Sequence, residues 1–199
     1  MAKIGLSKFV FGVITDETNE PVYKKGFVTD RPINYTFTPD VGEADLHAGD
    51  ILAESARELT GGKLAIEVAE FEQYEQALLL GNEINSEGEL VTNVNDEAPY
   101  VGFGLYGKVK RKGQTMIRAI FFKKAIFGEP SDTAKTKAKT IEFQTSTIEG
   151  TVMAVKGGCL KLEKLFEEED AAIEWLKSKA GFDAIAGSEV NNEEEDYTS

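Results

Sequence analysis

The stretch that decides the fold is APYVGFGLYGKVKRKG, residues 98–113. Beyond its first glycines, successive side chains alternate between two sides of an extended chain. One side carries Phe103, Leu105 and Val109, and the other carries Tyr106, Lys108 and Lys110. A period of two is typical of a β-strand with one buried face. We therefore predict a strand here, bent by its glycines.

The same glycines match two nucleotide-binding patterns. Gly102, Gly104 and Gly107 fit GxGxxG, and Lys108 after Gly107 nearly completes a phosphate-binding loop. A phosphate loop opens a helix and places Ser or Thr after its Lys. Position 109 is Val, and the alternation continues beyond it. The pattern therefore favours a kinked strand over a nucleotide site.

The elements around this stretch follow from periodicity and turn residues. A turn at Lys112-Gly113 leads into residues 116–127, whose apolar residues we expect on one face, so a hairpin is predicted. The apolar set is Ile117, Ala119, Phe121, Ala125 and Phe127. Further strands are expected over residues 4–15, 33–38, 63–68, 141–155 and 159–165, and helices over 71–80 and 168–179. The fold class is mainly β, a β-sandwich or barrel with one flanking α-helix and a short C-terminal helix.

Two helix ends carry local signals. Gly81 is placed to cap the first helix, and the acids at 167–170 and the lysines at 177 and 179 match the dipole of the second. Residues 42–62 are a long, mostly polar stretch that contains the short apolar run Ile51, Leu52 and Ala53, and we expect a long loop there, about residues 40–62, of the kind that is usually functional or partner-bound.

Charge and length limit the function classes. The 199 residues carry 35 acids and 22 Lys and Arg, a formal net charge of −13, which disfavours a nucleic-acid binder. Six acids and no Lys or Arg lie in residues 181–199, a composition typical of a solvated, disordered end. We expect one domain over 1–180 and an acidic tail over 181–199.

The sequence also limits compartment and redox chemistry. No apolar run approaches the roughly 20 residues of a membrane span, and the N-terminus lacks the apolar core of a signal peptide, so we expect folding in a cytoplasm. A single cysteine, Cys159, excludes an internal disulfide framework.

No catalytic set is apparent. His47 is the only histidine and lacks an evident orienting partner, and Cys159 fits a small packed hydrophobe better than a nucleophile. The acids at 167–170 lack the spacing of a calcium loop. We therefore predict no catalytic, cofactor-binding or metal-binding residue, and no enzyme activity.

Several short strings, in this order and spacing, carry a resemblance. They are Ala53-Glu54-Ser55, Thr60-Gly61-Gly62, residues 98–104, the Lys-Arg-Lys hairpin, Glu129-Pro130-Ser131, and Glu142-Phe143-Gln144 running to Glu149-Gly150-Thr151. Over residues 1–180 the chain resembles the major tail proteins, or tail tube proteins, of long-tailed siphophages of Gram-positive hosts.

The resemblance implies a structural virion protein with the β-sandwich or barrel of the phage tail tube type. Six copies would close into a ring, and rings would stack into a tube that conducts the genome into the host. It implies self-association, contacts with tape-measure, tail terminator and baseplate-type proteins, and DNA passing without specific binding, with no cofactor and no membrane. The protein would be assembled in the host cytoplasm and reside in the virion tail.

The expected assembly residues are charged. They are Asp45, Asp50 and Glu54 in the long loop, and Lys108, Lys110, Arg111 and Lys112 in the hairpin. Opposite charges across an interface set register and specificity, although solvated surface explains such residues equally well. Two other functions stay open: a tube protein of a contractile injection or secretion machine, and a monomeric ligand-binding β-barrel, including an enzyme that uses His47.

Overall fold

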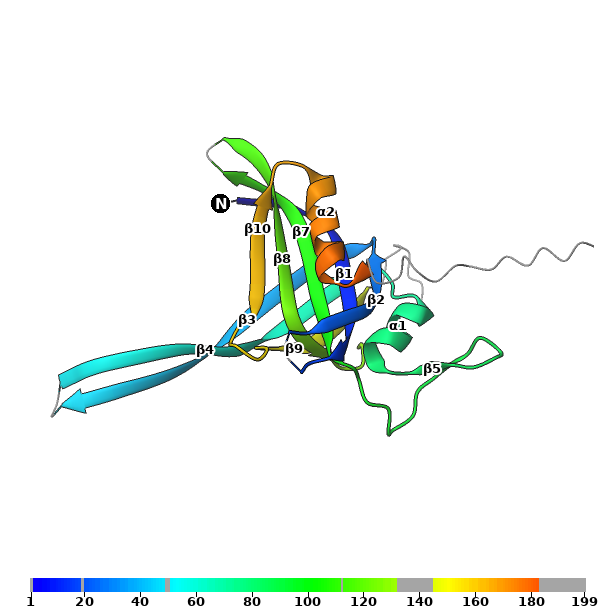
Figure 1. Ribbon diagram of the computed structural model, residues 1–199, viewed down its shortest axis with the longest axis horizontal. Helices are drawn as coiled ribbons and strands as arrows, with labels where there is room; N and C mark the ends of the chain where they lie inside the picture. The colour runs from blue at the N-terminus through cyan, green and yellow to red at the C-terminus, as the bar shows by residue number, and fades with distance from the viewer. Residues whose placement is uncertain (1, 19, 49–50, 112, 132–144, 183–199) are drawn as a thin grey trace, which may run out of the picture.

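The computed structural model describes residues 2–18, 20–48, 51–111, 113–131 and 145–182, with backbone alone at 2–4, 44–48 and 51–56. Its main feature is an eight-stranded antiparallel sheet in the order β2-β1-β7-β8-β9-β4-β3, with β10 added beside β8 (Figure 1). The strands are β1 (Ala2–Asp16), β2 (Val22–Thr29), β3 (Pro32–Ala48), β4 (Ile51–Val68), β7 (Val101–Arg111), β8 (Gln114–Phe127), β9 (Ser146–Met153) and β10 (Lys161–Phe166). A small pair, β5 (Glu83–Ile84) and β6 (Leu90–Val91), stands apart, and the helices are α1 (Gln73–Leu80) and α2 (Glu169–Lys179). The prediction of a mainly β fold with two helices is confirmed.

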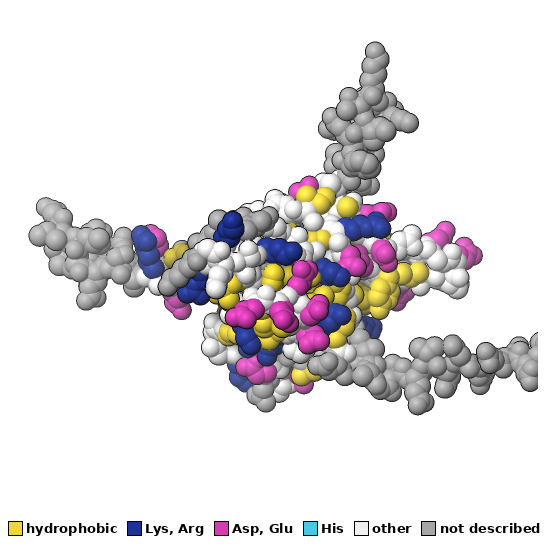
Figure 2. Space-filling model, turned by 90° about the horizontal axis from the view of Figure 1, so that it is seen from above, with side chains coloured by type: hydrophobic (Ala, Val, Ile, Leu, Met, Phe, Trp, Pro, Cys, Tyr) yellow, Lys and Arg dark blue, Asp and Glu magenta, His cyan; other side chains and the backbone are white. Residues whose placement is uncertain are grey.

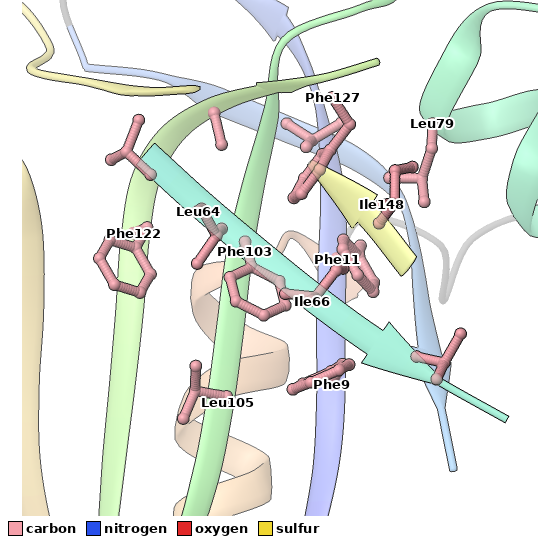
Figure 3. Packing of buried hydrophobic residues seen from close by; sticks show 14 of the residues in the cluster. Phe9, Phe11, Leu64, Ile66, Leu79, Phe103, Leu105, Phe122, Phe127 and Ile148 are labelled. Atoms are coloured by element: carbon pink, nitrogen blue, oxygen red, sulfur yellow. The ribbon is translucent and has the colours of Figure 1, made fainter. Parts of the chain in front are cut away.

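The sheet folds over itself because β8 changes partners along its length. Its residues 117–122 pair with β10, and residues 125–127 pair with β9. As a result β4 crosses over the face of β7 and β1, as Figure 3 shows. The main core lies between these two layers, where Phe9 and Phe11 each stand 5.1 Å from the ring of Phe103. Buried aromatic pairs at this spacing add to the free energy gained from burial.

The other face of the sheet is covered by α2. Tyr106 and Phe121 form a second core with Ala172 and Leu176 of the helix. Strand β7 is consequently buried on both faces from Val101 to Tyr106, where one buried face was predicted. The glycines of β7 explain the difference. A Cβ at Gly104 would lie 2.8 Å from Leu176 Cδ2, so the missing side chain is the space that the helix occupies.

The single apolar face predicted for residues 116–127 is wrong. Ile117, Ala119 and Phe121 face α2, whereas Ala125 and Phe127 belong to the main core. A register shift in the β7–β8 ladder lies between the pairs Phe103–Phe122 and Val101–Ala125. Because a bulge adds a residue to one strand, alternation restarts on the opposite face beyond it.

The long loop predicted at about residues 40–62 is also corrected. Strands β3 and β4 continue as a paired ribbon from the pair Pro32–Val68 to the pair Ala48–Ile51. Figure 1 shows this ribbon leaving the body of the molecule (cyan). A two-stranded ribbon in solvent has no buried face, so its sequence lacks apolar alternation and reads as a loop.

The predicted helix ends are confirmed. Gly81 takes the left-handed conformation at the end of α1, with φ of 76°. Glu169 and Asp170 lie in the first turn of α2, and Lys177 and Lys179 in its last turn. The strand predicted from residue 141 begins at Ser146 in the described chain, and residues 141–144, like the acidic tail from 183, lie outside the described residues.

Candidate assembly surfaces

The base of the β3–β4 ribbon carries an exposed apolar pair. Val41 and Leu59 are cross-strand partners, and their exposed fractions are 47% and 49%. Two residues further out, Glu43 and Arg57 are also partners, and Arg57 Nε lies 3.1 Å from Glu43 Oε1. Since residues two apart on a strand share a face, both pairs lie on the same side of the ribbon. Sequence reasoning missed all four residues because they were assigned to a loop.

The predicted acidic residues lie further along this ribbon. Asp45 is paired with Ser55 and Leu46 with Glu54, so the backbone brings Asp45 and Glu54 to neighbouring positions across the ribbon. Asp50 lies outside the described residues. His47 belongs to the same ribbon, opposite Leu52.

The predicted basic residues lie at the end of the β7–β8 hairpin. Lys110 and Arg111 are exposed and, among the described residues, form no ion pair, whereas Lys108 Nζ lies 3.9 Å from Glu169 Oε2 of α2. Lys112 lies outside the described residues. Figure 1 shows the β7–β8 hairpin and the β3–β4 ribbon leaving the body in different directions. The structure therefore brings the basic residues together with one another, and does not bring them to the acidic ribbon.

Three strands have a pairing partner on one side only within the described chain: β2 and β3 end the sheet order, and β10 pairs with β8 alone. The β3 edge also presents Ile33, which is 47% exposed. An unpaired strand edge is a template for another chain unless it is covered. These edges are therefore candidate surfaces for association.

Two side-chain contacts hold β7 and β8, the strands of the basic hairpin, to the neighbouring elements α2 and β10. The Tyr106 hydroxyl donates a hydrogen bond to Glu169 Oε1 at 3.0 Å, which ties the start of α2 to β7. Burial and this carboxylate raise the pKa of Tyr106, so the phenol stays neutral. Arg118 donates two hydrogen bonds of 2.7 Å to Glu163, which raises the pKa of Arg118, lowers that of Glu163, and holds β10 against β8.

A groove of about 210 Å³ opens between the start of β3 and the β1–β7–β8 face. Its wall is largely apolar, with Leu6, Ile33, Leu105, Val109 and Ile120, and Arg118 stands at its side. Among the described residues no cluster of His, Cys, Asp or Glu could hold a metal ion. Cys159 is a free thiol, and its Sγ lies 3.9 Å from the carbonyl of Lys161. The groove thus supplies apolar contact surface, and the described residues around it assemble no nucleophile with a base.

The surface seen in Figure 2 mixes both signs of charge. Basic and acidic side chains alternate over this face, with apolar side chains between them. A continuous basic stripe, the usual footprint of nucleic-acid binding, is absent from the described part of this face. In the part of the chain that the structure describes, no helix has the length and apolar character to cross a membrane.

Comparison with known proteins gives weak similarities. No protein-family model matches the sequence, and no curated protein matches it. Among solved structures, the chain is similar to one from the cap of the anti-feeding prophage, described as a tube terminating cap. That match has 9% identity, covers 82% of this chain and 92% of the other, and has a TM-score of 0.44. A chain of the anti-feeding prophage baseplate matches at 10% identity over 85% and 98% of the two chains, with a TM-score of 0.41.

Proposed function

We propose that this chain is a non-catalytic structural subunit of a phage-like tail, which associates with copies of itself. The observation that carries the proposal is the β3–β4 ribbon, which leaves the body with an exposed apolar pair, Val41 and Leu59, at its base. A two-stranded ribbon in water is marginally stable at best. A partner that covers one face of the ribbon supplies the missing burial.

The open edges support the same proposal. A free subunit with β2, β3 and β10 each unpaired on one side in the described chain is exposed to uncontrolled edge pairing. Closing copies into a ring would pair these open edges with neighbouring chains, and a head-to-tail contact that closes gives a ring of defined size. The fold therefore suits a subunit whose edges are completed by its neighbours.

In its finer form, the proposal is the major tail tube subunit of a siphophage. Stacked hexameric rings would form the conduit for genome ejection, with the tape-measure, tail terminator and baseplate-type proteins as partners. The number six and these partners rest on the sequence resemblance. The alternative we keep is a tube protein of a contractile injection or secretion system. The two solved structures named above come from a particle with a tube and a baseplate, but with TM-scores below 0.5 they carry no part of the argument.

Charge offers a specific contact between copies. Residues 40–61 hold six acids and one Arg, whereas residues 107–118 hold five Lys and Arg and no acid. Since the two hairpins diverge within one chain, their charges can meet only between chains (Figure 1). We assign the seven predicted residues to this contact, in which the acidic ribbon of one copy reaches the basic hairpin of another.

Negative-stain microscopy of the purified full chain tests the proposal. We expect rings or tubes in the wild type and loss of growth in Lys110→Glu/Arg111→Glu, because both residues are exposed and unpaired among the described residues. The reversed partner, Asp45→Lys/Glu54→Lys, should also fail alone, and combining the two pairs should restore growth. Failure of the combined variant, with each variant folded by circular dichroism, contradicts the hairpin contact.

Sizing by mass photometry separates the other classes. A stable monomer at every concentration, with no rings or tubes, argues for a ligand-binding barrel. The His47→Ala variant should assemble like the wild type, and an activity abolished by that change would establish an enzyme instead.

A further inference from the structure

A second charged surface lies at a bulge in β2. The β1–β2 ladder runs from Phe11–Phe27 to Val13–Lys24, so Lys25 and Gly26 together oppose Gly12. Lys25 has φ of 51°, and it is the one described non-glycine residue with positive φ. A Lys in this conformation is uncommon and strained. The bulge breaks the alternation of the strand, and both Lys24 and Lys25 face solvent as a result.

The end of α2 docks on this bulge. The carbonyl of Ala180 occupies the space that a side chain at Gly12 would need, and the ring of Phe182 lies over Gly26, 2.5 Å from where a Cβ would stand. Gly181, with φ of 75°, packs against the backbone of Tyr23. The described chain ends at Phe182, whose ring lies over Gly26 of β2, the last strand of the sheet order.

Four lysines belong to the two segments that meet here, and we call them the lysine cluster: Lys24 and Lys25 at the bulge, and Lys177 and Lys179 in the last turn of α2. Lys177 Nζ lies 5.8 Å from the centre of the Phe182 ring, which links the helix lysines to the bulge. None of the four forms an ion pair with a described residue. The nearby acids Glu17 and Glu20 are engaged elsewhere, by Lys124 at 2.6 Å and Lys123 at 2.7 Å.

We propose that the acidic segment 183–199 of the same chain binds the lysine cluster and lies along the open edge of β2. The segment has six acids and no Lys or Arg: Asp183, Glu189, Glu193, Glu194, Glu195 and Asp196. It starts one residue after Phe182, so it is tethered beside the cluster at an effective concentration on the order of millimolar or more. Charge complementarity and the place where the described chain ends both select this occupant. The contact does not depend on the proposed function.

One consequence bears on association. The outer side of β2 is an exposed strand edge, with Val22 45% exposed and no partner strand in the described chain. A charged segment held along such an edge keeps another chain from pairing with it.

Zero-length cross-linking of the full chain tests the contact. A carbodiimide joins carboxylates to lysines in direct contact, and mass spectrometry of an equal mixture of ¹⁴N and ¹⁵N protein separates links within a chain from links between chains. We expect single-isotope links from residues 193–196 to the lysine cluster, falling about fivefold in 0.5 M NaCl because the contact is screened. Links shared equally with Lys161 and Lys164, the exposed lysines of β10, or no tail links at all, overturn the proposal. Mixed-isotope links overturn it in favour of a neighbouring copy's tail.

A matched pair of variants measures how much the two lysines at the bulge contribute to holding the segment. In Lys24→Ala/Lys25→Ala, the remaining tail links to Lys177 and Lys179 should fall about threefold, since each lysine contributes to holding the segment. In Lys161→Ala/Lys164→Ala, which removes the same charge from another edge strand, they should be unchanged. Equal effects from the two variants would mean that net charge, and not the bulge, holds the segment.

Discussion

The seating of α2 on β7 makes a quantitative prediction about Gly104. Leu176 is fully buried in the second core, and a methyl group at Gly104 would stand 2.8 Å from Leu176 Cδ2 and 3.1 Å from Phe121 Cδ2. Leu176→Ala should cost about 3 kcal/mol of unfolding free energy, through lost burial and a cavity. Gly104→Ala should cost about 1–2 kcal/mol, because the crowding of the helix exceeds the roughly 0.5–1 kcal/mol that Ala gains over Gly in a strand.

The double variant decides between this account and a backbone role for Gly104. Once Leu176 is shortened, the methyl group fills part of the cavity, so Gly104→Ala in the Leu176→Ala background should be neutral or stabilising by about 0.5–1 kcal/mol. Urea unfolding, followed by the fluorescence of Trp175, measures all four corners of the cycle. If Gly104→Ala costs the same in both backgrounds, the glycine is needed for its backbone conformation and the packing argument is refuted.

Three further changes test other contacts. Glu163→Gln should remove a contribution to stability that depends on pH, because the pKa of Glu163 in the folded protein lies below its ordinary value of 4.5. The ion pair with Arg118 therefore stabilises the fold above pH 4.5, and this stabilisation is lost as the pH falls through the lower pKa of the folded state. The melting temperatures of wild type and variant should differ at neutral pH and converge at that low pH. Tyr106→Phe should cost about 1 kcal/mol in urea unfolding at pH 7 by removing the hydrogen bond to Glu169; an unchanged midpoint would show that water replaces it. Gly81→Ala should cost about 1–2 kcal/mol, since φ is 76° and its Cβ would collide with the carbonyl of Glu97, whereas Gly88→Ala, with φ of 81° and open space around it, should cost less.

Sequence reasoning located the elements whose signals are local. The turn predicted at Lys112-Gly113, the alternation after Gly104, and the Gly81 cap each depend on a few neighbouring residues. The structure has a turn at Gly113, a strand through Gly104 and a helix end at Gly81. The strands predicted over 33–38 and 63–68 are instead much shorter than β3 and β4. Strand β2 was not predicted, because its bulge at Lys25 and Gly26 interrupts the period of two. The pairing of β8 with both β10 and β9 depends on a register shift that no local sequence pattern predicts.

The candidate surfaces were predictable only in part. The basic residues of the β7–β8 hairpin stand out as a run of charge, and Lys110 and Arg111 are exposed in the structure, while their role in assembly stays a prediction. The pairing of Val41 with Leu59 and of Glu43 with Arg57 depends on the register of a ribbon that reads as a loop. The lysine cluster joins residues more than 150 positions apart, which only the docking of α2 on the bulge brings together.

Net charge sets a condition on association that the local contacts must meet. Each copy carries −13, so copies repel one another wherever their charges are not screened. At about 0.15 M salt the Debye length is roughly 8 Å, which screens this repulsion between subunit bodies while pairs in contact keep most of their attraction. At about 0.01 M salt the Debye length reaches roughly 30 Å, and the repulsion acts across whole subunits. If the acidic ribbon and the basic hairpin join copies, the rate of growth, followed by light scattering, should first rise with salt from about 0.01 M as the repulsion is screened. It should then pass through a maximum and fall towards about 1 M, where contact pairs are screened as well. A rate that only rises with salt would instead mean that apolar burial at Val41 and Leu59 drives association, with the charges merely opposing it.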